Sequence, residues 1–225
     1  MLVSYPTKAY VGKILPKSKI YEKTRVSAAL KRKFVEQIER ITWAYKLSPE
    51  TTNLPSSETV PEIEVFQIDL KGADISRDVI RCIDKAIPFP IIYEIASHDR
   101  RRVLAAFKRP SEGDSSKWVT DAYFESAWVR SDTERVPLFP SIDLRRLYEQ
   151  LLSRLMPVER RAGEAFEDTL ARAAEYWHLE REAASIQSRM QKEKQFNRKV
   201  ELNAEFRRLK KEIAALSESG AIATG

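Results

Sequence analysis

The chain has 225 residues, of which 43% are hydrophobic and 32% are charged, and its formal net charge is +6. This length and composition indicate a folded protein with a hydrophobic core. Cys82 is the only cysteine, which excludes an intrachain disulfide and a metal cluster held by several thiolates. With only 6 glycines among many charged residues, the composition favours long exposed helices, and the positive charge suits a polyanionic partner.

Metal and membrane sites are not expected. His98 and His178 each lack a second histidine or a cysteine at ligand spacing. The N-terminus has no continuous apolar segment, and no window approaches the length of a membrane span. We therefore expect a cytoplasmic, unsecreted protein with no membrane partner.

Residues 1–23 are expected to form an irregular basic arm, because five lysines are scattered there among two prolines. From Arg25, apolar residues recur three to five apart, which predicts an amphipathic helix that ends near Leu47. Residues 48–62 are rich in proline, serine and threonine and predict a loop. The helix and the loop begin a head domain that we place at residues 24–157.

Strand-like segments follow the loop. The run IEVFQIDL, which begins at Ile63, has the β-branched and aromatic content of a buried strand. A helix from Ser76, stopped by Pro88, separates this run from three others, FPIIYEIAS, RRVLAAFKR and KWVTDAYFESAWV. This order predicts an α+β fold, with a small mixed sheet of about four strands and flanking helices.

The remainder of the chain is predicted to be helical. An amphipathic helix begins at Ser141, and Pro157 marks a boundary. Residues 158–217 contain no proline and predict a long helical segment, whereas residues 218–225 predict a flexible tail. A single helix of about 60 residues would be about 90 Å long. We therefore expect either a helical hairpin or a coiled coil with another chain.

Two heptad frames, two residues out of phase, run through this helical segment. The phase shift predicts a break or a change of partner near Val200. Asn197 lies on the first frame, where a buried amide would fix the register of paired helices. Glutamates interleave with the basic residues and nearly neutralise them, so direct nucleic-acid binding by this helix is not favoured. The predicted partner-binding residues are Ile186, Met190, Asn197, Val200, Phe206, Leu209 and Ile213.

Asp69 and Lys71 are two residues apart on a predicted strand, so their side chains project from the same face. A metal-dependent nuclease of the PD-(D/E)xK kind requires this arrangement of its last acid and its lysine. The carboxylate would hold Mg²⁺, and the lysine would stabilise charge near the attacking water. Glu58, Glu62 or Glu64 would have to be the upstream acid, and no earlier strand is evident for the usual hairpin. The ordinary interpretation is a strand end with solvated charges.

Basic residues form two clusters that are candidate phosphate contacts. Clustered cations bind phosphates without reading the base sequence, and such binding weakens as salt rises. The alternative is a solvated surface. The candidates are Lys17, Lys19, Lys31, Arg32 and Lys33 in the first cluster and Arg100, Arg101 and Arg102 in the second.

Three segments of the chain, ITWAYKLSPET, EIEVFQIDLKG and KQFNRKVELNAE, together resemble a known family. They are similar to the bacterial family catalogued as domain of unknown function 4391, and the likeness covers most of the chain in the same order. The resemblance implies no catalytic residues. It implies a genetic setting beside a helicase of the SNF2 type and a DNA methyltransferase, in restriction-modification or phage-defence neighbourhoods.

We therefore expect a non-catalytic accessory subunit of a bacterial DNA-processing or antiviral defence complex. Its head would contact DNA phosphates, and its C-terminal helices would bind the helicase, the methyltransferase or a second copy of the chain. One alternative is a Mg²⁺-dependent nuclease that uses Asp69 and Lys71. Another is a structural homodimer without a DNA role. No cofactor is expected except Mg²⁺ in the nuclease alternative.

Overall fold

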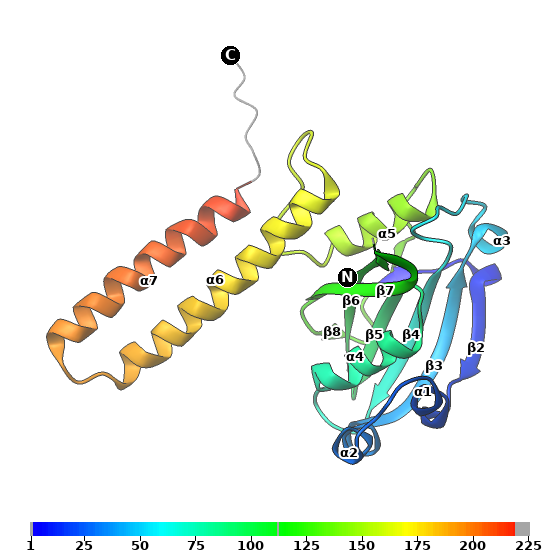
Figure 1. The fold of residues 1–225 in the computed structure, drawn as a ribbon, viewed down its shortest axis with the longest axis horizontal. Coiled ribbons are helices and arrows are strands. Elements are labelled where there is room, and N and C mark those ends of the chain that lie inside the picture. Colours follow the sequence, from blue (N-terminus) through cyan, green and yellow to red (C-terminus); the bar gives the residue numbers. More distant parts are fainter. Residues whose placement is uncertain (1, 112, 219–225) are drawn as a thin grey trace. The chain divides into compact units, whose positions relative to one another are not determined.

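The computed structural model describes residues 2–111 and 113–218. The chain divides into two compact units, the head (Met1–Leu155) and the helical unit (Met156–Gly225). The head (Figure 1) contains β1 (Val3–Ser4), η1 (Thr7–Ala9), β2 (Tyr10–Ile14), α1 (Lys17–Lys23), α2 (Ala28–Gln37), β3 (Ile38–Leu47), α3 (Pro49–Thr52), β4 (Ile63–Leu70), α4 (Arg77–Ala86), β5 (Ile91–Ser97), β6 (Arg100–Ser111), β7 (Asp114–Glu125), β8 (Val129–Arg130), β9 (Val136–Pro137) and α5 (Leu144–Ser153). The helical unit contains α6 (Phe166–Lys192) and α7 (Phe196–Ser217).

A seven-stranded sheet forms the centre of the head, with the order β2-β3-β4-β5-β6-β7 and with β8 paired to β6. β4 and β5 run parallel and are connected by α4, because parallel neighbours need a crossover. The other neighbours run antiparallel. β1 and β9 form a separate parallel pair. The predicted α+β class is confirmed, but the sheet is larger than the expected four strands.

The predicted helix from Arg25 to Leu47 is wrong in its second half. Ser27 caps α2 by accepting the N–H of Leu30 at 3.2 Å, and the helix ends at Gln37. The next ten residues form β3, which pairs with both β2 and β4. Two register shifts interrupt the pairing of β3 with β4. These bulges disturb the alternation of faces, so every third residue of β3 is buried and the strand imitates helical spacing.

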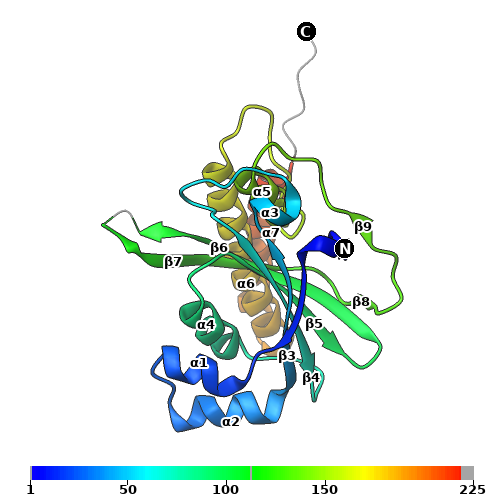
Figure 2. The same ribbon diagram turned by 90° about the vertical axis from the view of Figure 1, so that its right-hand side faces the viewer.

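Helices α1, α2 and α4 cover one face of the sheet (Figure 2). Apolar side chains from all three helices meet side chains from β3, β4, β5 and β6 in one buried core. Each large side chain that is fully buried contributes about 1.5–3 kcal/mol to folding. Central members of this core are Ile20, Phe34, Ile41, Ile68, Val79, Ile83, Tyr93 and Leu104.

The N-terminal segment is not an irregular arm. Leu2 and Ala9 are each 1% exposed, and β2 supplies a strand at one end of the main sheet. Most lysines of this segment are exposed. Because they are scattered among the few apolar residues that anchor the segment, the sequence pattern did not reveal these anchors. At the other end of the head, α5 begins after Asp143, whose carboxylate accepts the N–H of Arg146 at 2.7 Å.

In the helical unit, α6 and α7 form a hairpin, which was one of the two predicted arrangements (Figure 1). Residues 193–195 connect the helices, so the break lies there and not near Val200. The two heptad frames are out of phase because they belong to two different helices. The buried core of the hairpin consists of Leu179, Ala183, Ile186, Leu202, Leu209 and Ile213.

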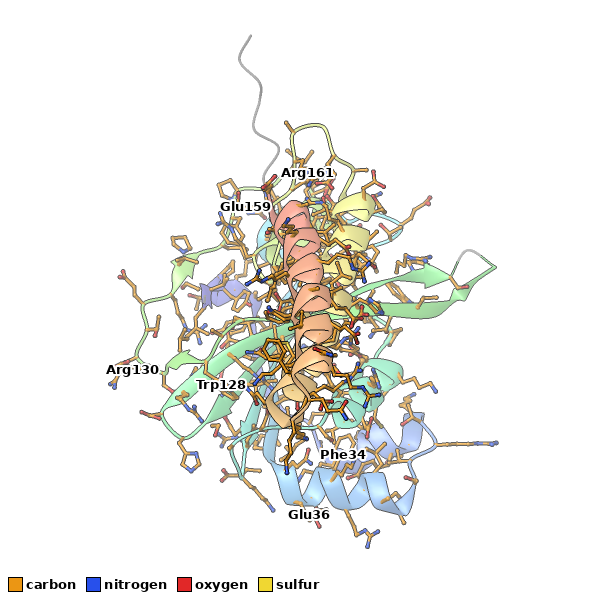
Figure 3. All side chains as sticks on the ribbon, turned by 90° about the vertical axis from the view of Figure 1, so that its left-hand side faces the viewer. Phe34, Glu36, Trp128, Arg130, Glu159 and Arg161 are labelled. Atoms are coloured by element: carbon orange, nitrogen blue, oxygen red, sulfur yellow. The ribbon has the colours of Figure 1, made fainter. Side chains whose placement is uncertain are left out.

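Two arginines close the end of the hairpin where α7 terminates. Arg172 pairs with Glu164 at 2.8 Å and donates to the carbonyls of Leu216 and Glu159. Arg161 donates to carbonyls of the last turn of α7, beside which Figure 3 places Glu159 and Arg161. Cations at this position satisfy the last carbonyls of a helix. Arg172 also lowers the pKa of Glu164 to about 2.

Candidate nucleic-acid interface

Positive charge concentrates on α1 and α2. Residues 17–37 carry seven lysines and arginines against Glu22 and Glu36, which leaves a formal charge of +5 out of the +6 of the whole chain. The buried side chain of Phe34 holds α2 against the core, whereas Glu36 lies on its outer side (Figure 3). We call the cations of this segment the α1–α2 cluster: Lys17, Lys19, Lys23, Arg25, Lys31, Arg32 and Lys33.

Two cations of the cluster already have acidic partners. The Nζ atom of Lys33 lies 2.7 Å from Asp78, and that of Lys19 lies 2.9 Å from Glu22. All four of these side chains are largely exposed, and such exposed pairs contribute about 0–1 kcal/mol. Both lysines can therefore exchange their carboxylates for a phosphate at little cost.

Lys17 is half-buried and donates to the backbone carbonyl of Ile38 at 2.6 Å. The other four cations of the cluster are more available. Lys23, Arg25 and Arg32 are exposed and form no ion pair with the residues that the structure describes. The Nζ atom of Lys31 lies 5.4 Å from the centroid of the Tyr21 ring, a cation–π contact that leaves its charge uncompensated. The cluster thus presents several cations that lack a counter-charge within the protein.

The second predicted cluster lies at the start of β6, directly after the turn that connects it to β5. His98 adopts a left-handed backbone conformation there, with φ of 54°. Arg100 is exposed, and its guanidinium carbon lies 5.2 Å from the ring centroid of Trp128. A guanidinium that rests on an indole keeps its outer edge free for a phosphate.

The other two arginines of that cluster are engaged within the head. Arg101 lies 3.9 Å from the buried carboxylate of Glu94. Arg102 is only 8% exposed, and its guanidinium pairs with Asp74 and, at 3.0 Å, with Glu125. Arg100 is therefore the member of this predicted cluster that is best placed to meet a ligand.

The predicted acid and lysine of the nuclease alternative have different surroundings. Asp69 pairs with Arg40 at 2.7 Å and accepts a hydrogen bond from Gln67 at 2.7 Å. Lys71 is exposed. Burial of Lys17 lowers the pKa of that lysine, and the nearby positive charge of Lys71 lowers it further. Lys71 therefore extends the α1–α2 cluster. Within the described residues, no three histidine, cysteine, aspartate or glutamate side chains gather as they would around a metal ion.

The sequence model of one protein family matches nearly the whole of this chain. The family is described as "Domain of unknown function (DUF4391)", and the match spans residues 3–213. The chain belongs to this family. No curated protein and no solved structure matches it. Among the described helices of this DUF4391 protein, none combines the length and apolar character that crossing a membrane requires.

The residues predicted to bind a partner divide into three groups in the DUF4391 hairpin. Ile186, Leu209 and Ile213 are 3%, 1% and 5% exposed and are used in the contact between α6 and α7. Met190 and Phe206 pack partly against this core. Asn197 and Val200 are exposed, so Asn197 does not set the register between α6 and α7.

A buried charged cluster, which the sequence did not suggest, joins α4 to β6 in the head. Lys108 is 1% exposed and donates to the backbone carbonyls of Asp84 and Ile87 at the end of α4. The carboxylate of Asp84 also accepts from the hydroxyl of Tyr123. Burial lowers the pKa of Lys108 to about 8, and burial raises the pKa of Asp84. Both residues serve the fold, because a lysine at a helix C-terminus satisfies its free carbonyls.

A second buried acid lies at the start of β4. Glu64 is 4% exposed and accepts a hydrogen bond from the indole N–H of Trp43. Burial, together with the neighbouring Glu62, raises the pKa of Glu64 to about 8. Glu62 itself pairs with Lys46 at 2.6 Å. Glu64 is therefore neutral below about pH 8 and serves the fold as a buried, uncharged hydrogen-bonding group.

Proposed function

We propose that this DUF4391 protein is a non-catalytic accessory subunit that contacts DNA phosphates through the α1–α2 cluster. The observation that carries the proposal is the concentration of a formal +5 on residues 17–37 of a chain whose total is +6. Several of these cations lack an acidic partner among the described residues. Such a surface neutralises phosphates and positions a protein on nucleic acid, but it does not read bases.

Arg100 is a secondary contact in this proposal. Its position on the ring of Trp128 restrains the guanidinium, so less conformational entropy is lost when it binds a phosphate. Arg102 contributes through the fold instead, because its ion pairs hold it against Asp74 and Glu125. Substitution of Arg102 therefore tests stability and not DNA contact.

The proposed partner, a helicase of the SNF2 type or a DNA methyltransferase, follows from the family resemblance. We assign its docking to the exposed side of the helical unit, because Ile186, Leu209 and Ile213 are already buried between α6 and α7. Trp177 on α6 is 38% exposed and is the best candidate anchor. Trp177→Ala should weaken co-purification with the partner without loss of helix content. Association of the chain only with itself, measured by light scattering, would favour the structural homodimer.

The DNA contact is tested with a double charge reversal, Lys31→Glu with Arg32→Glu. Both residues are exposed, so folding should be preserved. The affinity for a 30-base-pair duplex of arbitrary sequence, measured by fluorescence anisotropy, should fall at least tenfold at low salt. The matched control, Lys8→Glu with Lys13→Glu, changes the net charge equally outside the cluster. Equal affinities of the two variants would refute the assignment of the α1–α2 cluster.

One observation favours the nuclease alternative. β3 pairs antiparallel with β4, which supplies the neighbouring strand that the sequence did not reveal. The residue opposite Asp69 on that strand is Arg40, a cation and not a second carboxylate. Asp69 therefore has an ion-pair partner where the nuclease site requires another acid, and the accessory role remains the proposal that the geometry supports best.

A further inference from the structure

Positive charge concentrates a second time at the tip of the hairpin, where α6 gives way to α7. We call residues 189–200 the hairpin tip. This segment carries five cations against one acid, and all five are exposed and form no ion pair with the described residues. The cations are Arg189, Lys192, Lys194, Arg198 and Lys199.

The single acid of the tip is turned toward the backbone of its own loop. The carboxylate of Glu193 accepts the N–H groups of Lys194 and Gln195, each at 2.8 Å. These backbone hydrogen bonds lower its pKa, so the charge is present but partly satisfied. Glu201 and the later glutamates lie beyond the tip, along α7. The neutralisation expected from the sequence therefore applies to the body of α7 and not to the tip.

An aromatic ring stands among these cations. Phe196, the first residue of α7, is 78% exposed, more than any other large hydrophobic side chain in the described part of the chain. Val200 follows one turn later and is 52% exposed, so both side chains lie on the same side of α7. Exposed apolar groups of this size indicate a surface that contacts another molecule.

We propose that the hairpin tip binds single-stranded nucleic acid, with the ring of Phe196 stacked on a base and the five cations around the phosphates. Proteins that bind single strands combine an exposed aromatic ring with a positive surface in this way, because every base offers a stacking face. This inference rests on the proposed function and adds a second contact, one for unpaired strands. The α1–α2 cluster, by contrast, offers cations for a duplex backbone.

An acidic protein partner could also be attracted by the charge of the tip. Protein–protein interfaces, however, are depleted in lysine and enriched in arginine and aromatic residues. Three of the five cations of the tip are lysines. This composition favours phosphates as the ligands.

The test uses the full chain and two fluorescent probes, a 20-nucleotide oligothymidylate and a 20-base-pair duplex. Phe196→Ala should weaken binding of the oligothymidylate about 5- to 150-fold, the range expected when stacking of one base is lost. Binding of the duplex should be unchanged. Ile142→Ala is the matched control, because Ile142 is 76% exposed and lies in the head, outside the hairpin tip and the α1–α2 cluster. It truncates a large exposed side chain without removing a ring, and it should change neither affinity more than twofold. Circular dichroism should show equal helix content in all variants, since both side chains are largely exposed.

Equal affinity of wild type and Phe196→Ala for the oligothymidylate would overturn the inference. A second result would also overturn it: poly-L-glutamate at equal charge competes with the oligothymidylate, and Phe196→Ala has no effect. That result would indicate an acidic protein ligand. The head variant Lys31→Glu/Arg32→Glu separates the two proposals. If that variant binds the duplex as wild type does, the proposed function fails, whereas the comparison of Phe196→Ala with Ile142→Ala still decides the role of the tip.

Discussion

Substitution of Glu64 by glutamine should make the head more stable at neutral pH. The pKa of Glu64 is raised from its usual value of 4.5 to about 8 in the folded protein, chiefly by burial. The folded state therefore binds a proton more tightly than the unfolded state does. The stability that Glu64 contributes is therefore greatest below its pKa in the unfolded state, and it is lost as pH rises toward its pKa in the folded state. Glutamine keeps the shape and the acceptor for Trp43 but does not titrate.

The size of this effect follows from the interval between the two pKa values. Across it, each pH unit costs about 1.4 kcal/mol of unfolding free energy. Between about pH 6 and about pH 7.5, the wild type should lose about 2 kcal/mol through Glu64. For a unit of this size, that loss corresponds to a decrease of about 4–8 °C in Tm.

Urea unfolding, followed by tryptophan fluorescence at several pH values, measures this loss. Three of the four tryptophans, at positions 43, 118 and 128, lie in the head and report on it. Glu64→Gln should flatten the dependence of unfolding free energy on pH and exceed the wild type at about pH 7.5. The control Glu58→Gln, at an exposed position, should keep the wild-type slope. Parallel pH profiles for wild type and Glu64→Gln would refute the argument.

Three further predictions concern the charged groups of both units. Lys108→Met should destabilise the head by about 3–5 kcal/mol in urea unfolding, because it leaves Asp84 buried without its cation. The control Lys85→Met, at an exposed site of α4, should cost less than about 0.5 kcal/mol. The ion pair with Arg172 lets Glu164 stabilise the helical unit above about pH 4.5, and this stability is lost as pH falls toward 2. Arg172→Ala should remove this contribution. Circular dichroism should therefore show that the helix content of the variant depends less on acid pH than that of the wild type. If the nuclease alternative holds, Mg²⁺-dependent cleavage of plasmid should occur and should vanish in Lys71→Ala; absence of cleavage by the wild type supports the accessory role.

The sequence predicted the elements whose periodicity was undisturbed. The helix from Ser76 and the strand from Ile63 lie close to where the residue content of the strand and the stop at Pro88 predicted them. β3 was missed because its bulges bury every third residue, a spacing that a helix also produces. The N-terminal strands were missed because they are short and surrounded by lysines. Local patterns therefore predicted the fold class but not the width of the sheet.

Long-range pairing decided which candidate residues are available. Nothing in the spacing of Arg100, Arg101 and Arg102 distinguishes them, yet Arg102 is buried between carboxylates that come from other elements. The two heptad frames in the last third of the chain were visible, but only the turn at residues 193–195 shows that they face each other. That turn also brings Phe196 to an exposed position, which the frames alone do not predict.

The salt dependence of duplex binding tests the central claim most directly. The logarithm of the binding constant should fall linearly with the logarithm of salt concentration, by about 0.9 for each phosphate that the protein neutralises. Lys31→Glu/Arg32→Glu should lower the magnitude of that slope by about 2, whereas Lys8→Glu/Lys13→Glu should leave it unchanged. A wild-type protein that binds no duplex at low salt, or a slope that both double variants share with the wild type, would contradict the proposal that the α1–α2 cluster contacts DNA.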